Sequence, residues 1–196
     1  MHKAKNNLDR DKLTRQETYL IASCGIYCGA CDRFLGKSNE LAKELYRVID
    51  GFNIVDVAPI VLGVDHDNMR EFLAVLAKLR DAAICPGCNA GGGNPVCPVK
   101  ACVQEKGFLT CAECDKMPCN LIAPQHQEDQ MTACVHLEII TKRYANWNIR
   151  NLERIKAVGY RQVLNEMQEK VKKGFLTSDV ISSEPVIRQA LDKLNG

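Results

Sequence analysis

The spacing of hydrophobic residues predicts two helices in the first half of the chain. The segment Ser38–Ile49 has hydrophobic residues at intervals of three and four, can be capped by its own first residue and is ended by Gly51. The segment Asn68–Ala83 has a similar pattern and follows Asp65 and Asp67, either of which can cap it. We expect the hydrophobic stripes of both helices to be core. They comprise Leu41, Leu45, Val48 and Ile49 in the first helix and Met69, Phe72, Leu73, Leu76 and Leu79 in the second.

The rest of the pattern is also helical. A short helix is expected at Thr14–Ala22, and Gly159 and Gly174 separate helical segments in the last third. Two candidates for extended chain, Ile54–Val64 and Phe175–Ile181, are short and interrupted. The predicted fold class is mainly α, a small helical domain with cysteine-rich metal-binding loops and little or no β-sheet. The helices expected near the C-terminus are Ala133–Trp147, Asn151–Val158, Tyr160–Lys173 and a last one from Ser182 or Ser183 to Leu194, with Pro185 in its first turn.

Composition divides the chain into three regions. Residues 1–23 form a basic segment with the short helix, residues 24–134 form the cysteine-rich region, and residues 135–196 form a helical region expected to pack on it. With 196 residues, 46% of them hydrophobic, the chain is long enough for one compact domain, with or without a small metal-organised lobe. Its 26 basic and 24 acidic residues give a formal charge of +2, which indicates neither a nucleic-acid nor a membrane partner.

Cysteine is the unusual component, at 11 residues. The first residues are charged and lack the apolar stretch of a secretion signal, and no later apolar run is long enough for a membrane helix. We therefore expect a cytoplasmic protein without a membrane partner. In that reducing compartment, clustered cysteines are more often metal ligands than disulfides.

Three short motifs carry the candidate chemistry. Each has two cysteines separated by two residues and followed by Asp or Asn, at Cys28–Asp32, Cys85–Asn89 and Cys111–Asp115. Asp and Asn tolerate the left-handed conformation that a tight turn can need after its second cysteine. In such a turn two thiolates converge on one metal. One motif alone is weak evidence, but three with further cysteines between them indicate metal binding.

Ten cysteines are candidate ligands. Cys97 is expected to precede a short helix that begins at Pro98, because a helical step of five residues would put Cys97 and Cys102 on different faces. The flexible bend Gly91–Asn94 lets Cys97 approach the motif at Cys85–Cys88. Since zinc takes four ligands, ten thiols can fill two structural sites with two to spare. The ten are Cys24, Cys28, Cys31, Cys85, Cys88, Cys97, Cys102, Cys111, Cys114 and Cys119.

The order of these motifs resembles one known family. The stretches C-G-I-Y-C-G-A-C at 24–31, C-P-G-C at 85–88, C-P-V-K-A-C at 97–102, E-K-G at 105–107, C-A-E-C-D at 111–115, P-C at 118–119 and N-L-E-R-I-K-A-V-G at 151–159 are similar to the cysteine-rich family known as domain of unknown function 3795. The likeness covers residues 22–173. It implies a prokaryotic protein with a zinc or other metal site and no established reaction.

Iron–sulfur chemistry is the main alternative to zinc. Residues 24–31 have the cysteine spacing of radical S-adenosylmethionine enzymes, but Ala30 stands where those enzymes usually carry an aromatic residue, and the rest of the chain is helical. The sequence loosely matches an iron–sulfur protein of another kind, because proline follows Cys85 and Cys97 and proline often lies beside a cluster ligand. The cysteine spacing of ferredoxins is absent, however. Thiolates suit both elements, so spacing alone does not decide. A thiol redox protein is a further alternative. Against it, the sequence shows no strand–helix unit of the kind expected beside a redox motif.

Other residues give little indication of catalysis. His66 lies beside predicted helix caps, and His126 and His136 do not have the spacing of a zinc-binding H-E-x-x-H motif, so we favour surface roles. Cys134 is interpreted as a small buried apolar residue rather than a ligand. Fingerprints for phosphate, dinucleotide or a serine nucleophile are absent. Whether the protein is an enzyme stays open, and the sequence leans against it.

A basic segment is a second candidate surface. Residues 142–173 contain nine basic and three acidic residues, with Tyr144, Trp147 and Tyr160 among them. Such a segment can face nucleic acid, but a solvated helix face with the aromatics in the core is the simpler interpretation. The sequence therefore predicts an uncharacterised cytoplasmic metal-binding protein with one or two structural zinc sites and an interaction or regulatory role. Its partner is not identified; a protein is favoured over nucleic acid.

Overall fold

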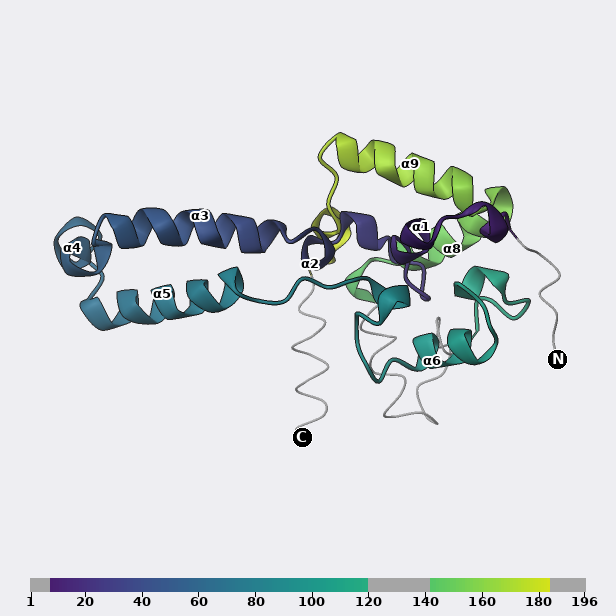
Figure 1. The fold of residues 1–196 in the computed structure, drawn as a ribbon, viewed down its shortest axis with the longest axis horizontal. Coiled ribbons are helices and arrows are strands. Elements are labelled where there is room, and N and C mark those ends of the chain that lie inside the picture. The colour runs from purple at the N-terminus through teal and green to yellow at the C-terminus, as the bar shows by residue number, and fades with distance from the viewer. Residues whose placement is uncertain (1–7, 120–141, 184–196) are drawn as a thin grey trace. The chain divides into compact units, whose positions relative to one another are not determined.

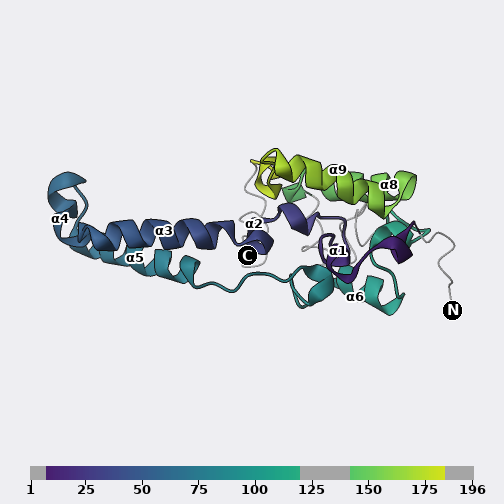
Figure 2. The ribbon, with the colours of Figure 1, turned by 45° about the horizontal axis from the view of Figure 1, so that its top comes forward.

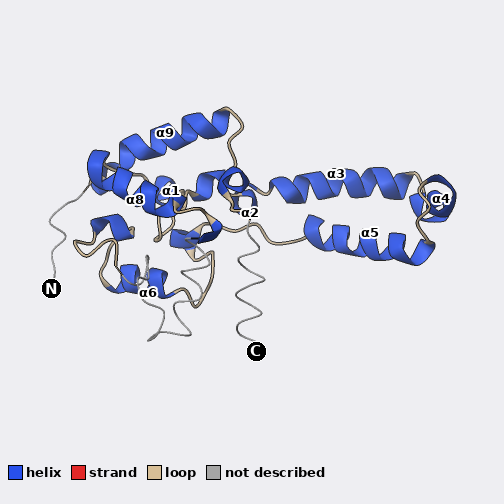
Figure 3. Cartoon of the chain, turned by 180° about the vertical axis from the view of Figure 1, so that it is seen from behind, coloured by secondary structure: helices blue, strands red, loops and turns tan. Residues whose placement is uncertain are grey.

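The computed structural model describes residues 8–119 and 142–183 (Figure 1). This part of the chain consists of helices and loops without a strand, apart from one isolated antiparallel bridge between Ile21 and Tyr27 (Figure 3). The predicted fold class, mainly α, is confirmed. The helices are α1 (Arg15–Tyr19), α2 (Asp32–Leu35), α3 (Lys37–Gly51), α4 (Ile54–Val61), α5 (His66–Arg80), α6 (Pro98–Glu105), α8 (Trp147–Val158) and α9 (Tyr160–Lys172), with 3-10 turns at Arg10–Lys12, Cys28–Ala30, Cys88–Ala90, Cys111–Glu113 and Thr177–Val180.

The chain forms two compact units. Unit 1 contains residues 1–34 and 86–196, and unit 2 is the stretch between them, residues 35–85. The three regions predicted from the sequence were defined by cysteine content, whereas these two units are defined by compactness. The units therefore do not test the three regions, which stay a prediction.

Unit 1 has a hydrophobic core that joins segments far apart in the sequence. Helices α8 and α9 pack against each other (Figure 2), and the rings of Trp147 and Phe175 lie 5.7 Å apart between centroids. Helix α6 contributes its buried residues Val99 and Val103 to the same core. The core includes Ile21, Tyr27, Ala30, Val99, Val103, Leu109, Ala112, Met117, Trp147, Leu152, Ile155, Tyr160, Val163, Leu164 and Met167.

Unit 2 is an antiparallel hairpin of α3 and α5, joined at its tip by α4 (Figure 1). At the open end of the hairpin, the Asn39 amide donates to the carbonyl oxygens of Arg80 and Ala82 at 3.3 and 2.6 Å. The Arg80 guanidinium also lies over the Tyr46 ring, 4.6 Å from its centroid. These contacts fix which residues of the two helices lie opposite each other.

Several predicted helix boundaries are confirmed. Asp65 caps α5, since its side chain accepts a hydrogen bond from the Asn68 N–H at 2.8 Å. Cys97 precedes α6, which has Pro98 in its first turn. Gly159, with a φ of 81°, ends α8 and is followed directly by α9.

Other boundaries differ from the prediction. Gly36 rather than Ser38 precedes α3, so that Ser38 lies inside the helix. The candidate extended segment after residue 53 forms α4, whose Ala58 is fully buried; packing on α3 and α5 outweighs the β preference of its Val and Ile residues. Thr177–Val180 is a 3-10 turn rather than extended chain.

The helix predicted to end at Trp147 lies mostly outside the described residues. Ala145 and Asn146 have positive φ angles of 46° and 58°, which interrupt a helix, so Trp147 begins α8 instead. The helix predicted to run to Leu194 also lies outside them.

The hydrophobic stripes predicted to be core are mostly exposed. Met69 and Leu76 are buried, but Leu41, Leu45 and Val48 of α3 are exposed, as are Phe72 and Leu79 of α5. The physical reason is that a two-helix hairpin covers only one narrow face of each helix. In α3 this face is centred on the small Ala42, so the larger residues beside it stay outside.

Candidate metal centre

Four cysteines of unit 1 line one small cavity. Cys102 comes from α6, Cys111 and Cys114 from the third C-x-x-C motif, and Cys119 from the chain that follows it. We call these four residues the α6 thiol set. The cavity has a volume of about 20 Å³, and its other walls are formed by Val99, Val103, Lys106, Phe108 and Met117.

The other three thiols of this set lie close enough to Cys111 to affect the ionisation of its thiol. The pKa of the Cys111 thiol is raised to about 12, first by burial and then by negative charge on the other three thiols of the set. The pKa of Lys106 is raised, chiefly by a hydrogen bond with Cys102. A half-buried thiol with this environment stays protonated unless a positive charge enters, and a metal ion is one such charge.

The third motif folds into a tight turn of its own. The Cys114 N–H donates to the Cys111 carbonyl at 3.0 Å, closing the 3-10 turn Cys111–Glu113. The Thr110 hydroxyl accepts from the Ala112 N–H at 3.1 Å. The Cys111 N–H donates to the Ser23 carbonyl at 2.9 Å, which ties the motif to the N-terminal segment. Both cysteines are therefore held by backbone contacts before any ligand is considered.

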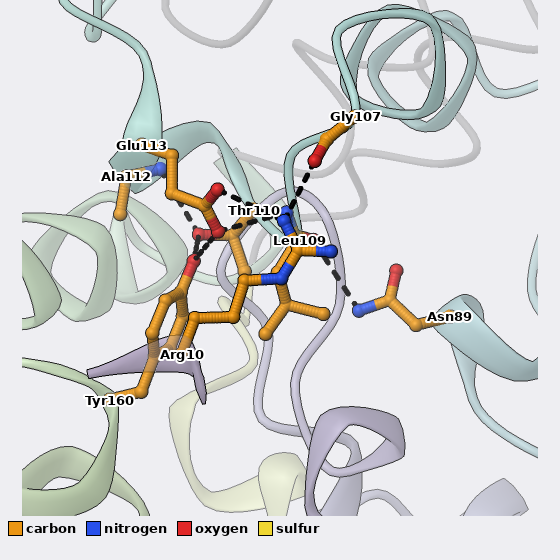
Figure 4. Close-up of polar contacts among 8 residues, drawn as sticks. All are labelled: Arg10, Asn89, Gly107, Leu109, Thr110, Ala112, Glu113 and Tyr160. Atoms are coloured by element: carbon orange, nitrogen blue, oxygen red, sulfur yellow. Dashed lines mark hydrogen bonds and ion pairs between the residues drawn. The ribbon is translucent and has the colours of Figure 1, made fainter. Parts of the chain in front are cut away.

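Glu113, inside this motif, is buried in a polar network (Figure 4). Its Oε1 accepts from the Leu109 N–H at 2.9 Å and from the Tyr160 hydroxyl at 2.7 Å. Its Oε2 lies 3.3 Å from the Arg10 guanidinium, and the Tyr160 hydroxyl is also 2.9 Å from Thr110 Oγ1. This network anchors the turn to α9 and to the N-terminal segment. The sequence shows a charged residue between two cysteines, which could have indicated this buried network, but the network was not predicted.

A second group of thiols surrounds Cys24. The Cys24 thiol is buried, and its pKa is raised far above the usual range, first by burial and then by charge on Cys88, Cys97 and Cys28. The group joins the N-terminal segment to the second motif and to the residue before α6. We call Cys24, Cys28, Cys88 and Cys97 the N-terminal thiol set.

Asn89 attaches the second motif to the N-terminal segment. Its side-chain amide lies within hydrogen-bond distance of the carbonyl oxygens of Ile21 at 2.7 Å and Thr18 at 3.2 Å. The Ser23 hydroxyl donates to Asn89 Oδ1 at 3.3 Å and lies 3.9 Å from Cys88 Sγ. The residue after the second cysteine of this motif thus holds the motif in place through the hydrogen bonds of its side chain.

The prediction of a left-handed residue after each motif is wrong. Asp32, Asn89 and Asp115 do not have positive φ angles. The first and third motifs close as 3-10 turns, which need no left-handed residue at that point, and in the second motif Gly87 takes a φ of 95° instead.

Two asparagines of α8 hold the turn that follows Cys24. The Asn151 amide donates to the Gly25 carbonyl at 2.8 Å, and the Asn148 amide donates to the Cys24 carbonyl at 3.4 Å. Both asparagines are buried. Sequence reasoning missed them; their position on the apolar side of an amphipathic helix was the available signal.

The remaining candidate ligands are less clearly grouped. Cys31 is half-buried and contributes to the raised pKa of Tyr144, whose main cause is burial. Cys85 is the last residue of unit 2. His66 is the first residue of α5, while His126, Cys134 and His136 lie outside the described residues. The structure records all ten candidate cysteines as thiols rather than disulfides.

Neither thiol set is a closed coordination site. Within residues 8–119 and 142–183, no three Cys, His, Asp or Glu side chains have an arrangement that could hold a metal ion. The donor atoms suit zinc or iron, and the α6 cavity offers room, but the thiols would have to turn toward a common point.

The basic segment 142–173 has its aromatic residues largely inside. Trp147 and Tyr160 are buried. Arg154 forms an ion pair with Glu166 at 2.7 Å, and Lys156 donates to the Met117 carbonyl at 3.2 Å. These contacts agree with a solvated helix face over a core, the simpler of the two interpretations.

Comparison with known families places this arrangement in context. The family described as Protein of unknown function (DUF3795) matches residues 20–124, more than half of the chain. The chain belongs to the DUF3795 family. The stretch matched by DUF3795 contains both thiol sets, Cys31, Cys85 and the whole of unit 2. The resemblance seen in the sequence is thus confirmed, although the match ends before residue 125.

No curated protein and no solved structure matches this DUF3795 chain. Among the helices of its described residues, none combines the length and apolar character needed to cross a bilayer.

Proposed function

We propose that this DUF3795 protein is a cytoplasmic zinc-binding protein in which two structural zinc ions organise the loops of unit 1. The observation that carries the proposal is the single cavity lined by the four cysteines of the α6 thiol set. Four thiolates around one ion form a common closed site for structural zinc.

The size of the cavity supports zinc over an iron–sulfur cluster. A volume of about 20 Å³ accommodates one water-sized body. A cluster of several irons and sulfides needs more space than a single ion, so the loops around it would have to move apart. Thiolates themselves do not distinguish the two elements.

The separation of the thiols into two groups supports two ions. The thiols that influence Cys24 are different from those that influence Cys111. Each group contains four cysteines from separate parts of unit 1, which matches the ligand number of one zinc ion. Cys31 and Cys85 would then be the two thiols that the ions do not require.

The inferred role of the metal is structural. The residues from Pro86 to Cys119 contain one helix of eight residues and otherwise turns, so they have little core of their own. Metal–thiolate bonds would supply the missing stabilisation. We infer an interaction or regulatory module, because both sets consist of cysteines alone and leave no evident place for a substrate.

The test is substitution of one cysteine from each set. We expect Cys88→Ser and Cys114→Ser each to lose one zinc ion by native mass spectrometry. Loss of a structural ion should also lower the free energy of unfolding by about 3 kcal/mol or more, which lowers the melting temperature by about 10 °C in a chain of this size.

Met117→Leu is the matched control, since Met117 lines the same cavity without a thiol. It should retain both ions and lose less than about 1.5 kcal/mol. Full retention of zinc and stability by both serine variants would contradict the proposal.

A further inference from the structure

A lysine lies among the cysteines of the α6 thiol set. Lys106 lines the same small cavity as the four thiols of the set. The other residues of the cavity wall are apolar, namely Val99, Val103, Phe108 and Met117. Lys106 is thus the basic residue of this wall.

The end of α6 puts Lys106 beside Cys102. The two residues are four apart in the sequence, a spacing that brings side chains to one face of a helix. The Lys106 N–H donates to the Cys102 carbonyl at 3.3 Å. Gly107, with a φ of 67°, then ends the helix, and the Phe108 N–H donates to the Val103 carbonyl at 3.0 Å. The lysine is therefore fixed to the last turn of α6.

The last turn of a helix is an unfavourable place for a thiolate. The carbonyl groups at this end carry partial negative charge, and Cys102 is among the last four residues of α6. A cation at the same end offsets that charge. The position of Lys106 therefore favours the ionised form of Cys102, which is the form that binds a metal.

Lys106 interacts with every thiol of the set. Its pKa is raised by Cys102 first and then by Cys114 and Cys119. Burial raises the pKa of the Cys111 thiol, and Lys106 acts on that thiol in the opposite direction. One ammonium group thus serves all four candidate ligands.

The charge of a four-thiolate zinc site gives this lysine a role. Four thiolates around one Zn²⁺ ion leave two negative charges in excess, and Lys106 can neutralise one of them. The N-terminal thiol set differs in this respect. After burial, the described groups that act most on the pKa of Cys24 are the Ile26 backbone and the thiols of Cys88, Cys97 and Cys28, none of which is a cation.

We propose that Lys106 is the charge-compensating residue of the α6 thiol set and strengthens zinc binding at this site without affecting the N-terminal set. The inference rests on the proposed function, because it concerns zinc at the same cysteines. Lys106 is exposed, so water and salt weaken its effect. Groups outside the ligand shell nevertheless change metal affinity measurably.

Zinc affinity of the full-length protein, measured by competition with a chromophoric chelator, tests the proposal. The Cys88→Ser chain keeps all four cysteines of the α6 thiol set and serves as the parent. Lys106→Gln in this parent should weaken zinc binding by about tenfold. Lys106→Arg should recover most of the loss, because arginine keeps the charge. The loss should also shrink as the salt concentration rises, which a merely structural role of the side chain would not produce.

Lys100→Gln is the matched control. It removes the same charge from α6, but the Lys100 ammonium donates to the Gly92 carbonyl at 3.2 Å, and neither residue lines the cavity. This variant should keep the zinc affinity of the parent. In the Cys114→Ser chain, which keeps the N-terminal thiol set, Lys106→Gln should leave the affinity unchanged.

The same comparison in the otherwise wild-type chain, read by native mass spectrometry during stepwise chelation, decides even where a serine variant fails to fold. Lys106→Gln should lower the chelator concentration that removes one of the two ions and leave the other ion unaffected. Unchanged zinc binding by Lys106→Gln, or a loss that arginine does not recover, would overturn this inference and leave the zinc sites themselves in place. A wild type that binds no zinc would overturn the proposed function together with it.

Discussion

Gly25 occupies a position in which a side chain would cause both backbone strain and a steric clash. Its φ is +91°, and a Cβ atom built there would lie 2.3 Å from the Asn148 carbonyl oxygen and 2.6 Å from Leu152 Cγ. We expect Gly25→Ala to lower the free energy of unfolding by about 2 to 5 kcal/mol, from left-handed strain and overpacking together. Denaturant titration measures this loss.

Gly174 provides the control, because its φ is +92° and nothing lies within 4 Å of an added Cβ. Gly174→Ala should lose only the strain, about 1 to 2 kcal/mol. Equal losses in the two variants would mean that α8 does not pack closely on the turn after Cys24.

At the scale of elements, α1 depends on the contacts of one carboxylate. Glu17 Oε2 accepts from the Thr14 N–H at 2.7 Å, while the Thr14 hydroxyl accepts from the Glu17 N–H at 3.3 Å; Arg161 of α9 forms an ion pair with the same carboxylate. The pKa of Glu17 is lowered, first by the Thr14 backbone bond and then by Arg161. Its contribution to stability is therefore present above the ordinary pKa of 4.5 and is lost as the pH falls below it.

Glu17→Gln should lower the free energy of unfolding by about 1 kcal/mol at neutral pH. The difference from wild type should shrink as the pH is lowered below 4.5, since the wild-type carboxyl then becomes neutral too. Glu153→Gln, at an exposed position of α8, is the control for removal of one carboxylate and should match the wild-type stability at neutral pH. A Glu17→Gln deficit that stays constant with pH would rule out the ionised carboxylate as its cause.

The sequence predicted where helices begin and end better than it predicted which faces of the helices are buried. The Asp65 cap and Pro98 in the first turn of α6 act through neighbouring residues, so the sequence alone contains the cause. Helix α4 forms from a Val- and Ile-rich segment because it packs on α3 and α5, which is a tertiary effect. The exposure of Leu45 and Phe72 likewise depends on which helix faces meet, and hydrophobic spacing does not specify this.

For the whole molecule, the sequence identified which residues are candidate ligands but not how they group. All ten cysteines follow from motif spacing. That Cys97 lies near Cys24 while Cys102 lies near Cys111 results from the fold of unit 1, in which α6 separates two cysteines only five residues apart. The supports of the sets, such as the buried Glu113 and Asn151 and the half-buried Asn89, are polar residues whose partners lie far away in the sequence.

Metal and sulfide content of the wild-type protein, purified without oxygen, tests the two-zinc proposal most directly. The expected result is a colourless protein with two zinc ions per chain and no acid-labile sulfide, whose melting temperature falls when a chelator removes the metal. A brown sample that contains iron and acid-labile sulfide would contradict the proposal in favour of a cluster. A metal-free protein whose stability is unchanged by added zinc would contradict metal binding altogether.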